Sequence, residues 1–497
     1  MLPYYYNIPA VSILLCMISG ISIPLLSSGR RAYRLTLFVS ATVTLLSALL
    51  MYKVIPLNEY FTYMMGHFPA PWGNELSAGP LEAMMGFIFG LVMFLSLLGG
   101  SMTLFHDILP GKQKFYFTMM NMLMAALLAM TYTNDLFTGY VFIEISTIAA
   151  CAIVVARDTP KTIGSTIRYL AISLLGSGLF LIGVVLLYCI TGHLLMPNIQ
   201  TQVLRLVSTG LYTVPLTVVA GLLFVGIAIK SALFPFGAWL PMAHGGATTT
   251  SSAVLSGLVL KGYIVMLIKI FYRVFTIDVI RDLNVTNIMF ACGLAGMIYG
   301  SIEAFREEHI KRMLAHSSMA QIGYIFMGIG LDVNLGVAAA FLQIMVHAFV
   351  KPLLFLCAGR LSEVYDHEKS SYRLRGSAHK DWVAGIGFTI GAMSMVGIPL
   401  LGGFAAKFYL VTSAMMNPAK LWPALITLMI SAVMNALYYM PEVIAIWTRC
   451  ELCTPNPVES NLGFDLISAP LLASGVIFLG LNGYTMIQVI QRGLALL

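Results

Sequence analysis

The chain has 497 residues, of which 59% are hydrophobic and only 10% are charged, and its formal net charge is +7. An ordinary soluble domain is about a quarter charged, so this composition cannot cover the water-facing surface of a soluble protein of that size. The excess of basic residues is better explained by short loops that set membrane topology than by nucleic-acid binding.

Apolar runs recur from one end of the chain to the other, and each is close to the length of about 20 residues that spans a bilayer as a helix. The strands of a membrane barrel would instead alternate in hydrophobicity over about ten residues. We therefore predict an all-α, polytopic membrane protein with about 14 transmembrane helices. Their predicted ranges are 8–27, 35–55, 81–104, 115–132, 136–156, 168–190, 212–236, 251–272, 287–304, 312–331, 336–358, 382–413, 421–447 and 464–490.

The first apolar run, 8–27, is too long for the core of a signal peptide and lacks a basic leader, so we expect it to be the first membrane helix. The predicted helices place successive loops on opposite sides of the membrane. The loops of one side carry many more Lys and Arg residues than those of the other, and they include Arg30, Arg31, Arg157 and Lys161. Because cytoplasmic loops hold the excess, we expect a multi-pass protein of the cell membrane with both termini on the outer side.

Two predicted helices contain helix-breaking residues. Pro235 and Pro241 follow one another closely at the end of the run 212–236, and Pro399, Gly402 and Gly403 interrupt the run 382–413. Such interruptions at corresponding positions in two halves of a transporter are typical of an inverted repeat with its transport site at the breaks.

This correspondence predicts two inverted five-helix repeats, formed by helices 4–8 and 9–13, with helices 7 and 12 broken. The expected parts of the chain are residues 1–114 with helices 1–3, residues 115–273 with the first repeat, residues 287–447 with the second repeat, and residues 464–497 with the last helix.

Five ionisable side chains fall inside predicted membrane helices: Glu144, Lys230, Lys261, Lys351 and Lys407. A charge at mid-bilayer costs about 3 kcal/mol on insertion scales. One lysine alone could reach the membrane surface with its long side chain, but five such groups indicate ion transport. Because burial weakens and a nearby carboxylate strengthens proton binding by an amine, Glu144 beside Lys230 would act as a switch on proton affinity.

Three histidines accompany these groups. His244 follows the first break, His316 opens the helix 312–331, and His347 lies four residues before Lys351 on the same helical face. A neutral imidazole can relay a proton near neutral pH. We expect His244, His347 and Lys351 to belong to the pathway and keep His316 as a candidate relay, with a structural role as the alternative for each histidine.

The seven cysteines give no sign of a metal site. Most lie in apolar runs, where Cys is an ordinary small hydrophobic residue. Cys450 and Cys453 form one CxxC pair, but a metal or cluster site normally needs four ligands. We therefore expect no metal, no cofactor and no redox centre in this chain.

The segments that carry these residues resemble the antiporter-like subunits of the complex I superfamily. That superfamily includes the proton-pumping membrane subunits of respiratory complex I (NADH-quinone oxidoreductase), the D-type subunit of Mrp cation/proton antiporters and the antiporter-like subunits of membrane-bound hydrogenases. The similar segments are Lys230 with 239–244 (WLPMAH), 261–263 (KGY), 312–324 (RMLAHSSMAQIGY), 347–351 (HAFVK) and 397–408 (GIPLLGGFAAKF).

The resemblance implies that Glu144 and Lys230 form a gating ion pair, that Lys261 carries the proton at the centre and that Lys407 is the exit. It also implies a proton-translocating or sodium/proton-exchanging subunit within a multisubunit redox-driven pump or antiporter, bound to other membrane subunits and lipid. If electron transfer drives transport, iron–sulfur clusters, and a nickel–iron centre or flavin, are expected in the partner subunits.

Some positions depart from the pattern of the superfamily: His316 stands where Tyr is usual, Gln321 where some members have His, and Gly237 where His is frequent. Two other functions stay open. One is the membrane subunit of an inorganic-carbon uptake system with the same fold, and the other is a structural subunit that transports nothing. An intramembrane enzyme would need a nucleophile, a metal cluster or a large soluble loop, and the sequence has no such feature.

Overall fold

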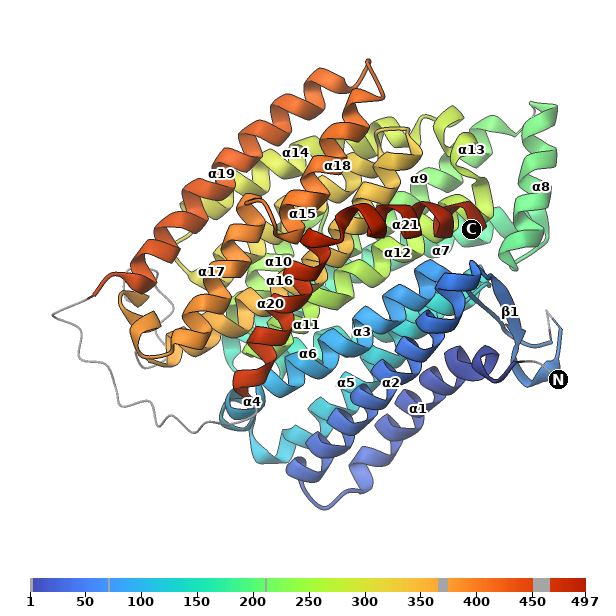
Figure 1. The fold of residues 1–497 in the computed structure, drawn as a ribbon. Coiled ribbons are helices and arrows are strands. Elements are labelled where there is room, and N and C mark those ends of the chain that lie inside the picture. Colours follow the sequence, from blue (N-terminus) through green and yellow to red (C-terminus); the bar gives the residue numbers. More distant parts are fainter. Residues whose placement is uncertain (1–2, 70–71, 211, 365–373, 450–464) are drawn as a thin grey trace.

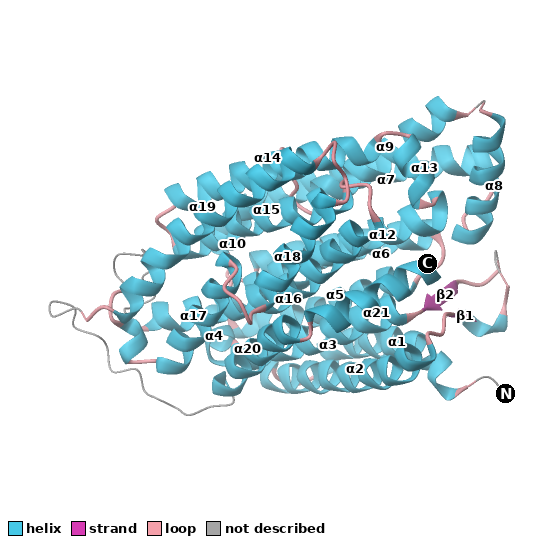
Figure 2. Cartoon of the chain, turned by 45° about the horizontal axis from the view of Figure 1, so that its top comes forward, coloured by secondary structure: helices cyan, strands magenta, loops and turns pink. Residues whose placement is uncertain are grey.

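The computed structural model describes residues 3–69, 72–210, 212–364, 374–449 and 465–497. Figure 2 shows helices through almost all of this part of the chain, with one short strand hairpin. The fold is therefore the predicted all-α membrane fold. Cys450 and Cys453, together with Lys369 and Arg373 of the basic loops, lie outside the described residues.

Most elements are α-helices joined by short turns. In chain order the elements are η1 (Tyr4–Asn7), α1 (Ile8–Ser22), η2 (Ile23–Leu25), α2 (Gly29–Leu57), β1 (Phe61–Met64), η3 (Met65–His67), β2 (Glu75–Ala78), α3 (Pro80–Gly99), α4 (Ser101–Asp107), α5 (Pro110–Tyr132), α6 (Leu136–Val155), α7 (Pro160–Thr191), α8 (Met196–Thr209), α9 (Thr213–Lys230), η4 (Phe236–Ala238), α10 (Trp239–Gly246), α11 (Thr249–Val254), η5 (Leu255–Val259), α12 (Leu260–Ile270), η6 (Phe271–Phe275), α13 (Ile277–Asp282), α14 (Val285–Arg306), α15 (Ile310–Ile329), α16 (Asn334–Glu363), η8 (Ser377–His379), α17 (Trp382–Val396), α18 (Gly402–Met415), α19 (Leu421–Trp447), α20 (Asp465–Leu481) and α21 (Gly483–Leu496).

Local sequence explains where many helices begin. Helices α3, α5 and α7 each start with a proline, which has no N–H to leave unpaired in the first turn. At other starts a side-chain oxygen accepts a hydrogen bond from a backbone N–H three residues later. These caps are Ser28, Asp135, Thr159, Thr248 and Asp381.

Within the described residues, eleven helices are long and apolar enough to cross a membrane, or up to twelve if α20 and α21 form one span. The structure thus confirms a polytopic helical protein, whereas the number fourteen is not confirmed. Helix α15 and the shorter helices α17 and α18 lie in the same bundle (Figure 1) but are not among these spans. The division into two inverted repeats stays a prediction.

Two parts of the chain differ from the sequence-based expectation. The predicted loop 56–80 contains an antiparallel hairpin in which Phe61 pairs with Ala78 and Met64 with Glu75. The last predicted helix, 464–490, is two helices, because α20 and α21 meet at a bend of 80°. In Figure 1, α21 crosses the bundle, and its Gly493 packs closely against Leu81 of α3.

Both predicted helix breaks are present. Helix α9 ends at Lys230, and the chain then passes through Ala232, which has a positive φ of 58°, to Pro235 before α10 begins. Helix α17 ends at Val396 and is followed by Gly397 at φ 103° and Leu400 at φ 75°. Left-handed backbone at a residue other than glycine costs about 1–3 kcal/mol, so both breaks are specified by their surroundings.

The glycines and prolines named in the sequence take part in these breaks. Pro241 lies within the first turn of α10, and Gly402 and Gly403 begin α18. A Cβ atom on Gly403 would lie 1.8 Å from the carbonyl oxygen of Ser394, so only glycine allows α18 to pack against α17 this closely. The break after Pro399 therefore depends on the absence of a side chain.

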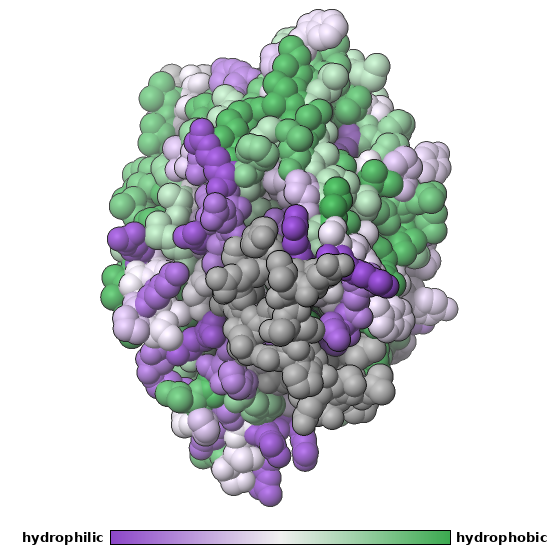
Figure 3. Space-filling model, turned by 90° about the vertical axis from the view of Figure 1, so that its left-hand side faces the viewer, coloured by the Kyte–Doolittle hydropathy of each residue, from purple (hydrophilic) through white to green (hydrophobic). Residues whose placement is uncertain are grey.

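The two ends of the bundle carry different elements. The hairpin end carries β1 and β2, and both described chain ends lie toward it (Figures 1 and 2). The α4 end carries α4 and the start of α17, and Figure 3 views the molecule from this side, where hydrophilic residues gather. A polar end and an apolar flank are expected when helices cross a membrane. Which side of the membrane each end faces stays a prediction.

Glycines bring the helices that carry the ionisable residues close together. A Cβ on Gly226 of α9 would lie 2.7 Å from the carbonyl oxygen of Gly176 of α7, and one on Gly323 of α15 would lie 2.6 Å from that of Gly293 of α14. Small residues at such crossings let backbones approach within a membrane. They hold α9 and α15 in fixed positions, and both helices contribute to the site described next.

Candidate functional site

Glu144 and Lys230 form an ion pair near the middle of α6. Lys230 Nζ lies 3.5 Å from Glu144 Oε1, and the lysine side chain is fully buried whereas 22% of the Glu144 side chain is exposed. Lys230 is the last residue of α9, so its ammonium lies at the negative end of that helix dipole. The sequence predicted this pair, and the structure brings its two members together.

Two further side chains lie beside Lys230, and a third holds one of them in place. Its Nζ donates a hydrogen bond of 2.7 Å to Thr147 Oγ1 and lies 5.6 Å from the centre of the Tyr263 ring. The Tyr263 hydroxyl accepts a 2.9 Å hydrogen bond from Ser146. Tyr263 is two residues after Lys261 on α12, so the helix that carries the next buried lysine packs beside the ion pair.

Lys261 lies immediately after a π-helical turn. The turn η5 precedes α12, and Lys261 Nζ donates to the backbone carbonyl of Ser256 within it. Turns of this kind are rare and often occur at functional sites. Lys261 is fully buried, and the Ser256 hydroxyl is hydrogen-bonded to that of Ser318 at 2.9 Å.

Lys351 is held by α15 and α19. Its Nζ donates 2.8 Å and 3.2 Å hydrogen bonds to the Leu314 carbonyl and the Tyr439 hydroxyl and also bonds to Ser317 Oγ. The Ser317 and Tyr439 hydroxyls are 2.6 Å apart. All of these groups are buried, so the ammonium is surrounded by oxygen atoms.

The ammonium of Lys407 lies at the break between α17 and α18. Its Nζ donates to the carbonyls of Met395 and Val396 at 2.6 Å and 2.9 Å, the last residues of α17. It also lies 5.3 Å from the centre of the Tyr324 ring. The negative end of a helix dipole favours a cation, so Lys407, like Lys230, sits at the C-terminal end of a half-helix.

Side chains of helix α15 lie near three of the buried lysines, Lys261, Lys351 and Lys407. Ser318 contacts the Lys261 region, Ser317 contacts Lys351, and Tyr324 lies beside Lys407. Between them, Gln343 Nε2 donates a 2.7 Å hydrogen bond to Gln321 Oε1, and both amides are fully buried. From the sequence, the segment 312–324 was noted only for its resemblance to the superfamily and for His316 as a candidate relay. The contacts of its hydroxyl and amide groups become visible only in three dimensions.

The three histidines differ in burial and in neighbours, and His244 and His347 are the more deeply buried. His244 and His347 are fully buried, and none of their ring nitrogens has a hydrogen-bond partner among the described residues. The His244 ring stacks on Phe355 with centroids 4.7 Å apart, one helical turn beyond Lys351. An unpaired buried nitrogen is typical of a site that holds water or transfers a proton.

His316 is only partly buried, and the charges nearest to it are Glu303, Glu307 and Arg312 rather than a lysine of the line. The structure therefore does not bring His316 into the row of lysines. Its role as a relay stays a prediction.

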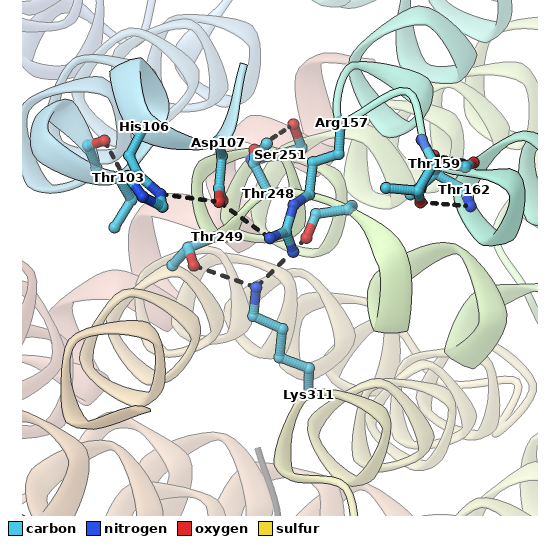
Figure 4. Close-up of polar contacts among 12 residues, drawn as sticks. Thr103, His106, Asp107, Arg157, Thr159, Thr162, Thr248, Thr249, Ser251 and Lys311 are labelled. Atoms are coloured by element: carbon cyan, nitrogen blue, oxygen red, sulfur yellow. Dashed lines mark hydrogen bonds and ion pairs between the residues drawn. The ribbon is translucent and has the colours of Figure 1, made fainter. Parts of the chain in front are cut away.

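Several polar side chains contact one another at the α4 end of the site (Figure 4). A polar cavity of about 20 Å³ there is lined by Thr249, Lys311 and Glu363, among others, which is enough room for about one water molecule. Arg157 pairs with Asp107 at 3.0 Å, and Lys311 donates a 3.1 Å hydrogen bond to Thr249 Oγ1. Lys311 is 2% exposed, so it is a further buried lysine that the sequence suggested only as a loop charge.

No group of three or more His, Cys, Asp or Glu side chains in the described ranges could hold a metal ion. The side chains of the site are lysines, carboxylates, imidazoles, hydroxyls and amides, which are groups that can exchange protons and bind water.

We expect Tyr439→Phe to lower ion transport about fivefold, because the loss of a hydrogen bond worth about 1 kcal/mol at Lys351 changes a rate by that factor. Transport by membrane vesicles, normalised to the amount of assembled protein, measures the effect. Tyr52→Phe is the matched control, because Tyr52 is 71% exposed on α2. Equal transport by the two variants would show that the Tyr439 hydroxyl does not contribute.

Comparison with protein families gives one match, to the family described as NADH:quinone oxidoreductase/Mrp antiporter, TM, over residues 133–435. The matched range contains Glu144, Lys230, Lys261, Lys351 and Lys407. Among curated proteins, NADH-quinone oxidoreductase subunit N of Desulforudis audaxviator is 31% identical over 388 residues, which is 77% of this chain and 74% of the relative. The D-type subunit of a Na(+)/H(+) antiporter from Alkalihalophilus pseudofirmus is 32% identical over 71% of this chain and 69% of the relative.

Solved structures share the fold along almost the whole chain. A chain of the Mrp complex from Dietzia sp. DQ12-45-1b superposes with a TM-score of 0.87 at 19% identity, covering 99% of this chain and 97% of that one. A chain of the membrane-bound sulfane sulfur reductase, an archaeal respiratory membrane complex, gives a TM-score of 0.87 at 24% identity, covering 98% and 97%.

Proposed function

Because this chain belongs to the NADH:quinone oxidoreductase/Mrp antiporter transmembrane family, we propose that it moves protons across the membrane as one subunit of a larger complex. Sodium ions are the alternative or exchanged cation, as the name of one relative suggests. The solved relatives belong to multisubunit membrane complexes, which supports other membrane subunits as the partners of this chain.

The observation that carries the proposal is the Glu144–Lys230 ion pair, with its lysine fully buried at the end of α9 and 3.5 Å from the carboxylate. A buried charge of this kind is expensive in a membrane and is kept where ions move. The Glu144 side chain remains partly exposed at the flank of the bundle, so its position can respond to a neighbouring subunit while Lys230 stays in the interior.

The proposed mechanism is a switch in proton affinity. While Glu144 stays close to Lys230, the carboxylate stabilises the ammonium form of the lysine. When Glu144 moves away, the buried ammonium becomes less stable and its proton passes by way of water and the hydroxyl groups around Tyr263 to Lys261. The groups on α15 then connect Lys261 with Lys351 and Lys407, where the proton leaves.

His244 and His347 would serve this pathway as neutral relays. A neutral imidazole accepts a proton on one nitrogen and releases one from the other, and both rings have unpaired nitrogens in the interior. Water bound between these rings and the lysines would complete the connection across the gaps that no hydrogen bond spans.

Energy would come from elsewhere in the complex. The residues of the site supply no redox chemistry, so iron–sulfur clusters, and a nickel–iron centre or flavin, are proposed for partner subunits if electron transfer drives transport. In an antiporter an existing ion gradient would replace them. Native purification in mild detergent with iron and nickel quantified in the same sample separates the two cases, because only the redox-driven complex contains stoichiometric metal.

Transport itself is tested with vesicles from cells that lack the gene and from cells in which it is restored. A pH-sensitive dye reports proton movement after addition of an electron donor or of sodium chloride. We expect a pH gradient that depends on the chain under at least one condition. Identical traces with and without the chain under both conditions would refute the proposed function.

A further inference from the structure

A second buried lysine–carboxylate pair lies near the hairpin end of the bundle. Lys269 Nζ on α12 is 3.5 Å from Glu82 Oε1 on α3, and the two side chains are 3% and 4% exposed. Both members of this pair are nearly as buried as Lys230. In the sequence-based topology Lys269 counted only as one of the basic residues of the outer side, and the buried lysines described above do not include it.

The contacts of the pair come from several elements. Lys269 Nζ donates hydrogen bonds to Ser77 Oγ of β2 at 3.0 Å and to the Thr131 carbonyl of α5 at 2.9 Å. Glu82 Oε2 accepts one from the backbone N–H of Gly79 at 3.0 Å. Glu82 Oε1 is buried and has no hydrogen bond among the described residues, so this oxygen remains able to accept a proton.

Polar groups continue from this pair toward an open cavity. The cavity has a volume of about 520 Å³, and its lining includes Glu75, Asp135 and His193. Glu75 accepts a 2.6 Å hydrogen bond from Asn134 Nδ2, and the buried Asn134 Oδ1 has no partner in the described structure. Glu75 and Ser77 are two residues apart on β2 and point to the same face of the hairpin, so the strand connects the cavity with Lys269.

Helix α12 carries both Lys261 and Lys269, and a π-helical turn adjoins it at each end. Turn η5 ends just before α12 begins, and η6 starts where α12 ends. The two lysines are eight residues apart, which is about 12 Å along a helix. A π-helical turn is uncommon and often occurs at a functional site. Since α12 lies between two such turns, we expect this helix to shift more easily than a continuous α-helix.

We propose that Glu82 and Lys269 form a second ion-pair gate, through which protons pass between Lys261 and the hairpin-end cavity in parallel with Lys407. The inference rests on the proposed function, since Lys261 must carry the transported proton. Buried apolar residues such as Ile264 and Ile268 separate the two lysines on α12, so the route conducts when water enters this stretch. The ammonium of Lys269 then gives its proton to Glu82, which leaves both groups neutral, and the carboxylic acid releases it to water of the cavity.

A purely structural role for the pair makes a different prediction. Lys269 and Glu82 also fix the hairpin to the bundle, through Ser77 and Gly79. Glu82→Gln keeps an oxygen for the Gly79 N–H and nearly the same shape, but it removes the group that accepts and releases a proton. A structural defect would lower transport by the same factor in every background, whereas a parallel route matters most when the other route is blocked.

The test compares vesicles with the complete complex carrying Glu82→Gln, Lys407→Met or both, with transport normalised to assembled complex. We expect Glu82→Gln to lose about a tenth of the transport, Lys407→Met to lose about tenfold, and the double variant to lose at least about a hundredfold, well beyond the product expected of independent sites. Glu59→Gln is the control, since Glu59 accepts a 2.7 Å hydrogen bond from Tyr5 at the same end of the molecule and lies outside this network.

A double variant that loses no more than the product of the single losses would overturn the second gate, and so would complete loss of transport in Lys407→Met alone. A Lys230→Ala variant separates this failure from that of the proposed function. If Lys230→Ala abolishes transport while the double variant follows the product, only the second gate is wrong. If Lys230→Ala transports normally, the proposed pathway through the lysines is wrong as well, and the proposed function itself fails only if vesicles with and without the chain give identical traces.

Discussion

Replacement of Lys230 by alanine is expected to abolish proton transport while leaving the complex assembled. Without the ammonium, a proton near Glu144 has no buried group to receive it and faces a penalty of about 3 kcal/mol in the membrane interior. A barrier of that size slows a reaction about a hundredfold. The Lys230 side chain contacts residues of α6 and α12, and its loss removes one hydrogen bond and one ion pair, so the fold itself should survive.

Vesicle acidification measures the transport of Lys230→Ala, and the yield of intact complex in native purification measures its assembly. Lys53→Ala is the matched control, because Lys53 is partly exposed on α2 and its ammonium lies beside the exposed ring of Tyr52. Lys53 also precedes Glu144 and all the buried lysines in the sequence by more than 90 residues. Acidification at the wild-type rate by Lys230→Ala vesicles would show that the proposed line of lysines is not the pathway.

Replacement of Lys261 by arginine is expected to be as damaging as its removal. Arginine keeps the positive charge but does not release its proton in a protein. If Lys261 only balances charge, Lys261→Arg should transport normally. If Lys261 takes up and releases the transported proton, transport should fall about a hundredfold. Without a group to bind it, the proton would face a barrier of about 3 kcal/mol in the membrane interior.

The larger guanidinium could also disturb packing around Ser256, so Lys261→Met provides the second measurement. Methionine has nearly the length of lysine, lacks the charge and fits irregular apolar space. We expect Lys261→Met and Lys261→Arg to assemble and to fail equally in transport. Normal transport by Lys261→Arg combined with failure of Lys261→Met would limit Lys261 to an electrostatic role.

Much of this site could be predicted because its key groups are out of place in a membrane. Lysines at 230, 261, 351 and 407 stand out against apolar sequence, and the helix breaks were visible as Pro235, Pro399 and the glycines after it. Their number and spacing were sufficient for the prediction of an ion-transporting bundle. The structure then brought Glu144 within 3.5 Å of Lys230, a long-range contact for which the sequence offered no distance.

The parts that were missed depend on contacts between distant segments. Lys269 is buried because β2 and α3, almost 200 residues earlier in the chain, pack over it. Ser317 and Tyr439 look like ordinary helix residues until α15 and α19 bring them to Lys351. Helix α8 was missed because its buried residues Met196, Ile199 and Val203 form too short a pattern to be read as a membrane span.

The bend between α20 and α21 was missed for a local reason. The chain there reads Leu-Asn-Gly at 481–483, a short turn signal inside a long apolar stretch. A single glycine is tolerated within a membrane helix, so the sequence favoured one continuous helix. Packing of Gly483 against Ala405 and of Gly493 against Leu81 explains why the chain turns across the bundle instead.

The small cavity at the α4 end has a consequence for leakage across the membrane. The described residues leave room for about one water beside Lys311, against about 520 Å³ in the cavity at the hairpin end. Residues of the Asp107–Arg157 pair and of the Lys311–Thr249 hydrogen bond line the small cavity. If these contacts separate only while the hairpin end is closed, transport would need no continuous channel, and the membrane would stay sealed between turnovers.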